Sequence, residues 1–259
     1  GASSGRLILG HREDGRMILE EIHRFGNGMV RKQGHLVWDV DQLFAEIITG
    51  MKKCAELGKI PESIGVDTWA VDFVLLDAKD QRLGDAVGYR DHRTQGMDQS
   101  VYEVIDEEEL YLRTGIQKQP FNTIYQLMAV KEQIPELMEQ ADALLMIPDY
   151  LHFLLSGQKV TEYTNASTTS MLDPVARDWD REVLAQAGIP ERIFRKPVMP
   201  GTRGAKLHGW DSGRLEKDRV GGSVLGETHT VRFRGSRHRP VQAGQEGIVL
   251  GQSHRLHSA

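Results

Sequence analysis

Apolar and polar residues alternate in short runs over the first 40 residues of the chain, a pattern typical of β-strands. We expect strands at residues 6–10 and 17–24, joined by a turn at Glu13-Asp14-Gly15, and a third strand at residues 35–38. Three short strands in succession predict a β-meander at the start of the chain.

A helix is predicted next, because apolar side chains recur every three or four residues from residue 43 to residue 57. Asp39 is the expected N-cap, with Gln42 three residues later as in a capping box. Gly58 is expected to end this helix.

Two apolar strands then enclose a polar break, which carries Asp67, Thr68, Trp69 and Asp72 between residues 63–66 and 73–76. One interpretation is a hairpin whose Asp residues form the turn and whose Trp packs in the core. The other is a backbone reversal at a sheet edge that holds polar groups toward a ligand. Together with the preceding meander and helix, the strands indicate a mixed sheet in an α/β architecture.

The rest of the chain up to residue 200 predicts short helices separated by one strand and by loops. The expected helices are residues 100–112, 123–132, 149–155 and 180–187, with a strand at residues 143–147 and a loop at 162–169. Gly157 and Gly188 are expected to end the last two helices.

The composition excludes several kinds of protein. Cys54 is the single cysteine, so neither a disulfide framework nor a multi-cysteine metal site can form within the chain, and we predict a cytoplasmic protein. No apolar run approaches the roughly 18 residues needed to cross a bilayer, so no membrane partner is expected.

Charge divides the chain into two parts, residues 1–200 and 201–259. The second part has ten Lys and Arg against five Asp and Glu, a net charge of +5, which leaves −10 on the first part. Its basic residues lack helical or strand periodicity and have too few aromatic neighbours for a stacking surface, so no nucleic-acid partner is expected. We predict an aberrant, disordered tail, or alternatively a divergent domain linker.

Few polar motifs suggest chemistry when taken alone. The small residues of Gly1-Ala2-Ser3-Ser4-Gly5-Arg6 could cradle a phosphate with their backbone N–H groups, although such turns are common. Asp91-His92-Arg93 is better explained as a salt-bridged loop than as a proton relay. Asp39 and Asp41 are better explained by helix capping than by metal binding, and Cys54 by packing.

Taken in order, several segments resemble the FGGY carbohydrate-kinase family. The matching segments, which run from residue 1 to about residue 201, are Gly1-Ala2-Ser3-Ser4-Gly5-Arg6, Glu21-Ile22-His23-Arg24-Phe25, Trp38-Asp39-Val40-Asp41, Gly65-Val66-Asp67-Thr68-Trp69-Ala70-Val71-Asp72-Phe73, Tyr89-Arg90-Asp91-His92-Arg93-Thr94, Gly115-Ile116-Gln117, Pro120-Phe121-Asn122-Thr123, Pro148-Asp149-Tyr150 and Glu162-Tyr163-Thr164-Asn165-Ala166. No single match is decisive, but the ordered set is specific.

The resemblance implies the N-terminal domain of a sugar kinase with the ribonuclease H-like fold shared with actin and hexokinase. It further implies phosphorylation of L-rhamnulose at its primary hydroxyl, with ATP and Mg²⁺ as cofactors and the sugar and ATP as small-molecule partners. By the same resemblance, Ala2, Ser3, Ser4, Gly5 and Arg6 bind ATP.

The substrate-binding residues implied by the resemblance are Trp69, Ala70 and Asp72, with the loop from Gln117 to Asn122 as a further pocket wall. Ala70 stands where the family usually has Gly, a difference of one methyl group that puts its direct contact with the sugar in question. Other sugars, such as xylulose, fuculose or glycerol, and a non-catalytic sugar-binding module are the alternatives.

Two further family features are expected but are not found in the sequence. The catalytic base of the family is an Asp in a His-Asp-Thr segment a little beyond residue 220, where this chain reads Gly226-Glu227-Thr228-His229. The first strand of the fold, with its metal-side Asp, would precede Gly1. We therefore expect an incomplete domain over residues 1–200, an out-of-frame tail over 201–259, and no catalytic activity from this chain alone.

Overall fold

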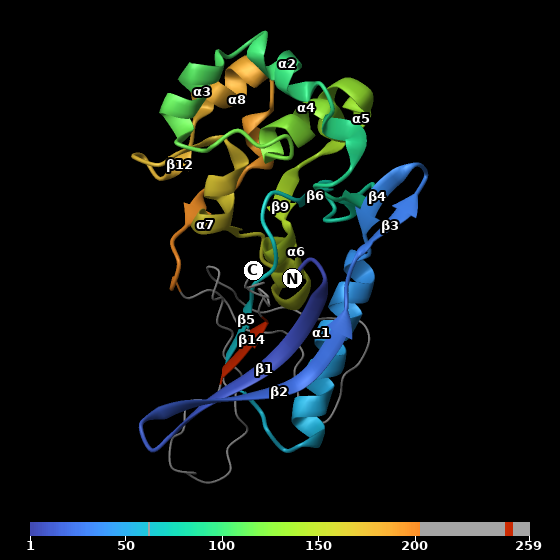
Figure 1. Ribbon diagram of the computed structural model, residues 1–259, viewed down its shortest axis with the longest axis vertical. Coiled ribbons are helices and arrows are strands. Elements are labelled where there is room, and N and C mark those ends of the chain that lie inside the picture. The colour runs from blue at the N-terminus through green and yellow to red at the C-terminus, as the bar shows by residue number, and fades with distance from the viewer. Residues whose placement is uncertain (62, 203–246, 251–259) are drawn as a thin grey trace, which may run out of the picture.

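The computed structural model describes residues 1–61, 63–202 and 247–250. Figure 1 shows two lobes, one built around a twisted sheet and a long helix, the other built mainly of short helices. Each lobe has its own apolar core. The α/β class expected from the sequence is confirmed.

The first lobe contains a four-stranded sheet of order β2-β1-β14-β5, whose strands are β1 (Ser4–Glu13), β2 (Arg16–Gly26), β14 (Gly247–Leu250) and β5 (Ser63–Val66). The predicted turn between β1 and β2 is confirmed, and both Asp14 and Gly15 have positive φ angles (47° and 79°). Such a turn has the twist that an antiparallel hairpin needs.

The strand β14 lies between β1 and β5 (Figure 1), although it is far from both in the sequence. It runs antiparallel to β1, with Ile8 opposite Val249, and parallel to β5, with Ile64 opposite Ile248. Without a strand in this place, β1 and β5 would each present an unpaired edge. The prediction of an aberrant tail over residues 201–259 otherwise falls on residues outside the described ones and stays a prediction.

Helix α1 (Val40–Glu56) covers one face of this sheet, and α6 (Ile147–Ser156) packs beside it. The predicted N-cap is confirmed, since the Asp39 carboxylate accepts a hydrogen bond of 2.9 Å from the backbone N–H of Gln42. The Gln42 side chain donates to Glu46. Leu7, Leu9 and Ile64 are buried from the sheet side of the core.

Two three-stranded sheets join the lobes. One has the order β3-β4-β8, from β3 (Met29–Lys32), β4 (His35–Trp38) and β8 (Ala86–Val87); the other has the order β7-β6-β9, from β7 (Arg82–Leu83), β6 (Phe73–Leu76) and β9 (Ala143–Met146). Alternate residues of β6 enter different cores, Phe73 the helical one and Val74 the sheet one. Because successive side chains of a strand point to opposite faces, this sheet separates the two cores and contributes side chains to both.

The hairpin interpretation of residues 64–76 is wrong. Among the described residues, β5 pairs with β14, whereas β6 pairs with β7 and β9. The polar break therefore carries the chain from one sheet to another, with Val71 in the left-handed region (φ 66°). The pairing of β5 and β6 depends on strands that are distant in the sequence, and the residues of the turn do not predict which strands these are.

The helical lobe consists of α2 (Met97–Tyr102), α3 (Glu107–Thr114), α4 (Thr123–Gln133), α5 (Pro135–Gln140) and α8 (Arg181–Ala187). The single helix predicted over residues 100–112 is wrong, because Asp106 caps the first turn of a new helix by accepting from the N–H groups of Glu108 and Glu109. The expected helices at 123–132 and 180–187 are confirmed, the latter ending at Gly188.

The remaining short elements are η1 (His92–Thr94), β10 (Thr161–Glu162), α7 (Tyr163–Ala166), η2 (Ser167–Thr169), β11 (Leu172–Asp173), β12 (Asp178–Trp179), η3 (Glu191–Ile193) and β13 (Pro197–Val198). The loop predicted at 162–169 is wrong, since the Glu162 carboxylate caps α7 through the N–H groups of Thr164 and Asn165. The strand at 143–147 and the helix ending at Gly157 are confirmed.

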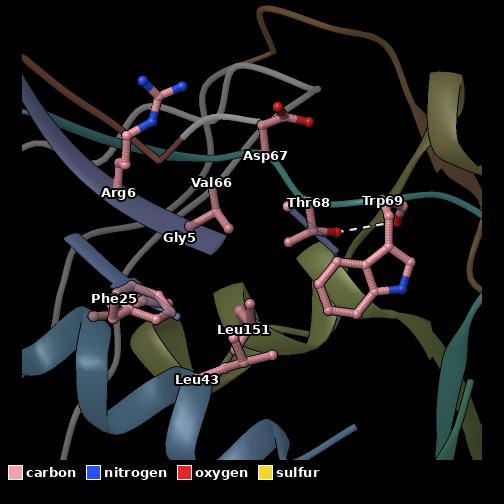
Figure 2. Close-up of a pocket in the computed structure, with 11 residues that line it drawn as sticks. Gly5, Arg6, Phe25, Leu43, Val66, Asp67, Thr68, Trp69 and Leu151 are labelled. Carbon is pink, nitrogen blue, oxygen red and sulfur yellow. Dashed lines mark hydrogen bonds between the residues drawn. The ribbon is translucent and has the colours of Figure 1, made fainter. Parts of the chain in front are cut away.

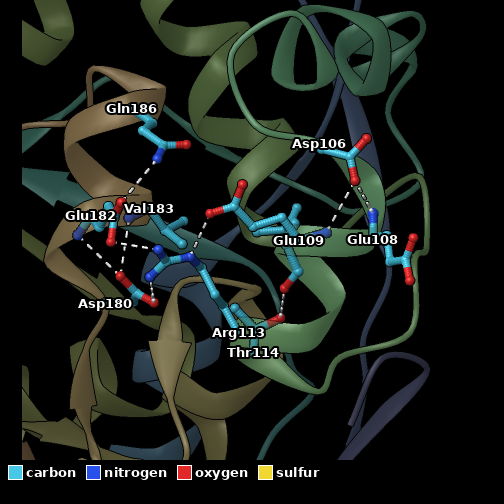
Figure 3. A network of polar contacts seen from close by, with 10 residues as sticks. Asp106, Glu108, Glu109, Arg113, Thr114, Asp180, Glu182, Val183 and Gln186 are labelled. Atoms are coloured by element: carbon cyan, nitrogen blue, oxygen red, sulfur yellow. Dashed lines mark hydrogen bonds and ion pairs between the residues drawn. The ribbon is translucent and has the colours of Figure 1, made fainter.

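One arginine joins α3 to α8 (Figure 3). The Arg113 guanidinium lies 2.9 Å from Glu109 on its own helix, 3.3 Å from the N-cap Asp180 and 2.5 Å from Glu182 on α8. In the part of the chain that is described, no helix is long and apolar enough to span a bilayer.

The placement of β14 generates a stability prediction. Every interior N–H of a strand flanked on both sides donates to one neighbour, so Val249→Pro removes a ladder hydrogen bond. We expect a loss of about 1–3 kcal/mol in the free energy of unfolding, measured by urea denaturation. Val249→Thr is the matched control, since it keeps the N–H and a β-branched side chain. Equal stability of the Pro and Thr variants would contradict the placement of β14.

Candidate functional site

The polar break between β5 and β6 forms a rigid turn. The Asp72 N–H donates to the Ala70 carbonyl at 2.9 Å, which closes the turn on itself. The Val71 carbonyl accepts from the Thr123 hydroxyl at 2.8 Å and from Gln126 Nε2 at 3.2 Å, so helix α4 holds the turn from behind. These bonds compensate for the positive φ of Val71, an unfavourable conformation for a β-branched residue.

Asp72 is the centre of this turn and is completely buried. Its Oδ2 accepts from Trp38 Nε1 at 2.6 Å, from Trp69 Nε1 at 2.9 Å and from the Tyr89 N–H at 3.1 Å. Its Oδ1 accepts from Gln126 Nε2 at 3.0 Å. One carboxylate thus joins β4, the turn, the loop after β8 and α4.

Burial raises the pKa of Asp72 above its ordinary value, although the four donors favour the charged form. A buried cation lies nearby, because Arg93 donates to Gln126 Oε1 at 2.6 Å while Gln126 donates to Asp72. Burial lowers the pKa of Arg93 to about 10, against the attraction of Asp72 and Asp91. Arg93 nevertheless stays protonated at neutral pH.

Aromatic rings surround the turn. The Trp38 and Trp69 ring centroids are 4.0 Å apart, and Tyr89 follows at 6.4 Å from Trp38. Phe121, in the loop from Gln117 to Asn122, meets Tyr89 edge to face at 5.6 Å. A row of flat apolar surfaces beside polar groups is the kind of lining that a sugar ring packs against.

The first loop of the chain lies on the other side of the turn (Figure 2). Asn27 holds this loop by donating its backbone N–H to Ser3 and its side-chain amide to Gly1. Gly5 packs so closely on Phe25 that an added Cβ would lie 2.0 Å from the ring. Glycine is therefore required here for a close approach.

Arg6 and Asp67 lie at the mouth of a small hollow of about 30 Å³ between this loop and the turn. In Figure 2 both charged groups point away from the apolar floor formed by Leu43 and Leu151. The hollow is lined by Gly5 and Phe25 on one side and by the turn on the other. A residue with a cationic side chain and a residue with a carboxylate thus line the same hollow.

The structure brings the two groups of predicted site residues to one region. Gly5 and Arg6, which the structure places at the start of β1, and Trp69, from the turn, line the same hollow. Ala70 is partly exposed between two buried neighbours, which suits a residue that faces a ligand. The binding roles given to Ala2, Ser3, Ser4, Gly5, Arg6, Trp69, Ala70 and Asp72 remain predictions, and the burial of Asp72 favours a role in positioning the pocket walls.

Trp38, Arg93 and Gln126 are members of this site that sequence reasoning did not assign to it. Each reaches Asp72 or its partner from an element at least 20 residues away along the chain, so periodicity gives no signal for them. Trp38 and Arg93 do lie in segments that resemble the family, but the resemblance gave them no contact with Asp72, and Gln126 lies inside a predicted helix with no such signal.

The alternatives chosen for other polar motifs agree with the structure. Asp91 lies 2.9 Å from His35 and 3.6 Å from His92, and it accepts from the Arg93 N–H, so polar contacts within the loop explain this motif. Asp41 pairs with Arg82 at 2.7 Å, and the pair lowers the pKa of Asp41. Cys54 is buried in the core of the sheet lobe.

Residues 1–206 match the model of the N-terminal domain of the FGGY family of carbohydrate kinases. The chain is 52% identical over 207 residues to the rhamnulokinase of Halalkalibacterium halodurans, covering 80% of this chain and 44% of that protein. It is 51% identical over 194 residues to the rhamnulokinase of Oceanobacillus iheyensis, covering 75% and 41%. The chain therefore spans about two fifths of the length of these relatives.

Solved structures show a similar fold. The xylulose kinase of Rhodospirillum rubrum superposes with a TM-score of 0.64 at 18% identity, covering 79% of this chain and 44% of that one. At this identity the likeness concerns the fold, and it confirms the expected architecture of a sugar-kinase N-terminal domain.

The close approach at Gly5 predicts a selective cost for a side chain there. Gly5→Ala forces Phe25 to move, and we expect a loss of about 1–3 kcal/mol in unfolding free energy by urea denaturation. Gly26→Ala is the matched control, because a Cβ there meets nothing within 4 Å. Phe25→Leu should restore part of the loss in Gly5→Ala; an equal effect of both Ala variants would refute the steric explanation.

The carboxylate of Asp72 predicts a cost for the isosteric amide. Asp72→Asn replaces one carboxylate oxygen with an amide NH₂ group, which donates where buried N–H groups need an acceptor. We expect the free energy of unfolding to fall by at least about 1–3 kcal/mol, and the tryptophan emission spectrum to change. Asp85→Asn, at an exposed pair with Lys32, is the control and should cost less than about 1 kcal/mol. A native-like Asp72→Asn variant would show that the donors do not depend on the charge.

Proposed function

The chain belongs to the FGGY family of carbohydrate kinases, and from this membership we propose that it serves the ATP-dependent phosphorylation of L-rhamnulose at the primary hydroxyl. In this reaction the sugar oxygen forms a bond to the γ-phosphorus, the bond from that phosphorus to the β,γ-bridging oxygen breaks, and the hydroxyl proton passes to a base. The products are L-rhamnulose 1-phosphate and ADP.

The observation that carries the choice of sugar is the identity of about one residue in two to rhamnulokinases over 207 and 194 residues. The match to the family model covers residues 1–206, which include both the first loop and the turn. We infer that Trp69 and Ala70 contact the ketose. Asp72, held by four donors, fixes the orientation of Trp38 and Trp69. Because these walls are set before a ligand arrives, little ordering is left for the binding step.

The phosphate groups of ATP fit the first loop. Backbone N–H groups of Ala2 to Arg6 that are not taken up by pairing with β2 can donate to them, and the Arg6 guanidinium adds charge. Mg²⁺, when bound, neutralises phosphate charge, and it usually takes one or two carboxylates together with phosphate oxygens. Asp67 is the carboxylate at this opening that would hold it.

This sequence does not contain the catalytic base in the form that the family uses. No His-Asp-Thr segment occurs in the 259 residues, and Gly226 to Phe233, where it was expected, lie outside the described residues. A general base contributes about 10²–10⁴-fold to such a reaction. We therefore propose that this chain binds the sugar but transfers phosphoryl groups only at background rate.

The test is sugar binding, measured by calorimetry with the 259-residue chain. Ala70→Leu fills the space beside Trp69 and should weaken L-rhamnulose binding by at least about tenfold, or 1.4 kcal/mol. Ala70→Gly, which introduces the residue usual in the family, should bind at least as well as the parent. Ala78→Leu, the same substitution at an exposed position after β6, is the matched control and should leave binding unchanged.

Two results would contradict the proposal. Tighter binding of D-xylulose, L-fuculose or glycerol than of L-rhamnulose would overturn the choice of sugar. A coupled assay of ADP release that shows robust turnover with L-rhamnulose would overturn the assignment of this chain as catalytically incomplete.

A further inference from the structure

Two imidazoles and a carboxylate converge at the start of β4 and in η1, separate from the turn and the first loop. One ligand atom each from His35, Asp91 and His92 lies within 4.8 Å of the others. Over residues 1–61, 63–202 and 247–250 this is the one group of three or more His, Cys, Asp or Glu side chains that meets such a limit. The sugar- and phosphate-binding roles proposed above do not use it.

The carboxylate of this cluster is fixed in place by the backbone. Asp91 Oδ2 accepts from the Leu36 N–H at 2.7 Å, and Oδ1 accepts from the Arg93 N–H at 2.9 Å. Only 1% of the Asp91 side chain is exposed. Backbone donors that orient a carboxylate in this way are what a metal ligand needs from its surroundings.

The two imidazoles lie against the carboxylate and remain open to solvent. His35 Nδ1 is 2.9 Å from Asp91 Oδ1, and His92 Nδ1 is 3.6 Å from Asp91 Oδ2. The rings are almost parallel, at 5°, with centroids 5.4 Å apart. Their side chains are 35% and 61% exposed, so an ion can reach the nitrogen atoms from solvent.

We propose that His35, Asp91 and His92 bind a divalent transition metal ion of the Zn²⁺ type. Tetrahedral Zn²⁺ with bonds of about 2.0–2.1 Å separates neighbouring ligand atoms by about 3.3 Å. One ligand atom from each of the three side chains lies within 4.8 Å of the others, and each imidazole already lies 2.9 Å or 3.6 Å from one of the two Asp91 oxygens, so small side-chain rotations reach that separation. Two nitrogen ligands favour Zn²⁺, Ni²⁺ or Cu²⁺ over Mg²⁺ or Ca²⁺, and a fourth position is left for water.

An ion in this site would tie two elements that border the sugar-facing turn. His35 is the first residue of β4, the strand that ends with Trp38. His92 begins η1, directly after the loop whose Tyr89 N–H donates to Asp72. A metal ion that binds the folded chain and not the unfolded chain stabilises the folded state, so the melting temperature should rise with metal concentration.

The test is a titration of the chelator-treated 259-residue chain with ZnCl₂ in a buffer that does not bind metals, with the heat of binding measured by calorimetry. The variants are His35→Ala and His92→Ala, with His11→Ala as the matched control, because His11 lies on β1 beside Glu13 and outside the cluster. Repeating the titration with CoCl₂ adds the visible absorption of tetrahedral Co²⁺, which reports ligand geometry. His92 is exposed, so its variant should fold.

We expect His35→Ala and His92→Ala each to raise the dissociation constant for one Zn²⁺ ion per chain by at least about tenfold. Even the loss of a residue that only hydrogen-bonds to a metal ligand lowers metal affinity by that much. Both should also lose the tetrahedral Co²⁺ absorption, whereas His11→Ala keeps the affinity and the spectrum of the parent. Parent-like affinity in either cluster variant, or the same loss in His11→Ala, would overturn the site.

Discussion

The candidate site depends on one buried charge, the carboxylate of Asp72. Four donors reach it from β4, the turn, the loop after β8 and helix α4, and burial of the group raises its pKa at the same time. Desolvation disfavours the carboxylate, so every lost donor leaves both a poorly solvated charge and an unpaired N–H group. Both indoles are therefore fixed together, because neither ring can rotate without leaving its own N–H group and the carboxylate short of a hydrogen bond.

The sheet sets where that carboxylate stands. The turn leaves the end of β5, and β5 is paired through β14 to β1, the strand that continues from the first loop. The first loop and the turn therefore start from strands of one sheet, separated by the width of a single strand. Backbone pairing has little freedom in this direction, since adjacent strands lie about 4.8 Å apart. The separation between the first loop and the turn is thereby a property of the sheet.

Local chemistry made much of the fold predictable. Asp39, Gly157 and Gly188 mark helix ends by side-chain or left-handed caps, and Asp14-Gly15 forms the turn that a two-residue hairpin loop demands. Predictions failed where partners were distant or capping was unusual. The signal for the break at Asp106 was present, an Asp followed by acidic residues, but the continuous apolar spacing hid it. Glu162 belongs to a residue type that rarely caps helices, so the sequence contained no recognisable start signal for α7. The strands that pair with β5 and β6 cannot be identified from the sequence of residues 64–76.

The candidate site was predictable as a set of residues and not as an arrangement. The segment order pointed to the first loop and to the turn, but the contact of Trp38 with Asp72 spans 34 positions and only folding creates it. Within the proposed function, this arrangement has a consequence for coupling. Asp67 lines the hollow next to the first loop, and Ala70, three residues later in the same turn, is partly exposed. Since Val71 and Asp72 fix that turn through α4 and β4, a shift that repositions the sugar wall also moves Asp67, and the two substrates are placed by one rigid element.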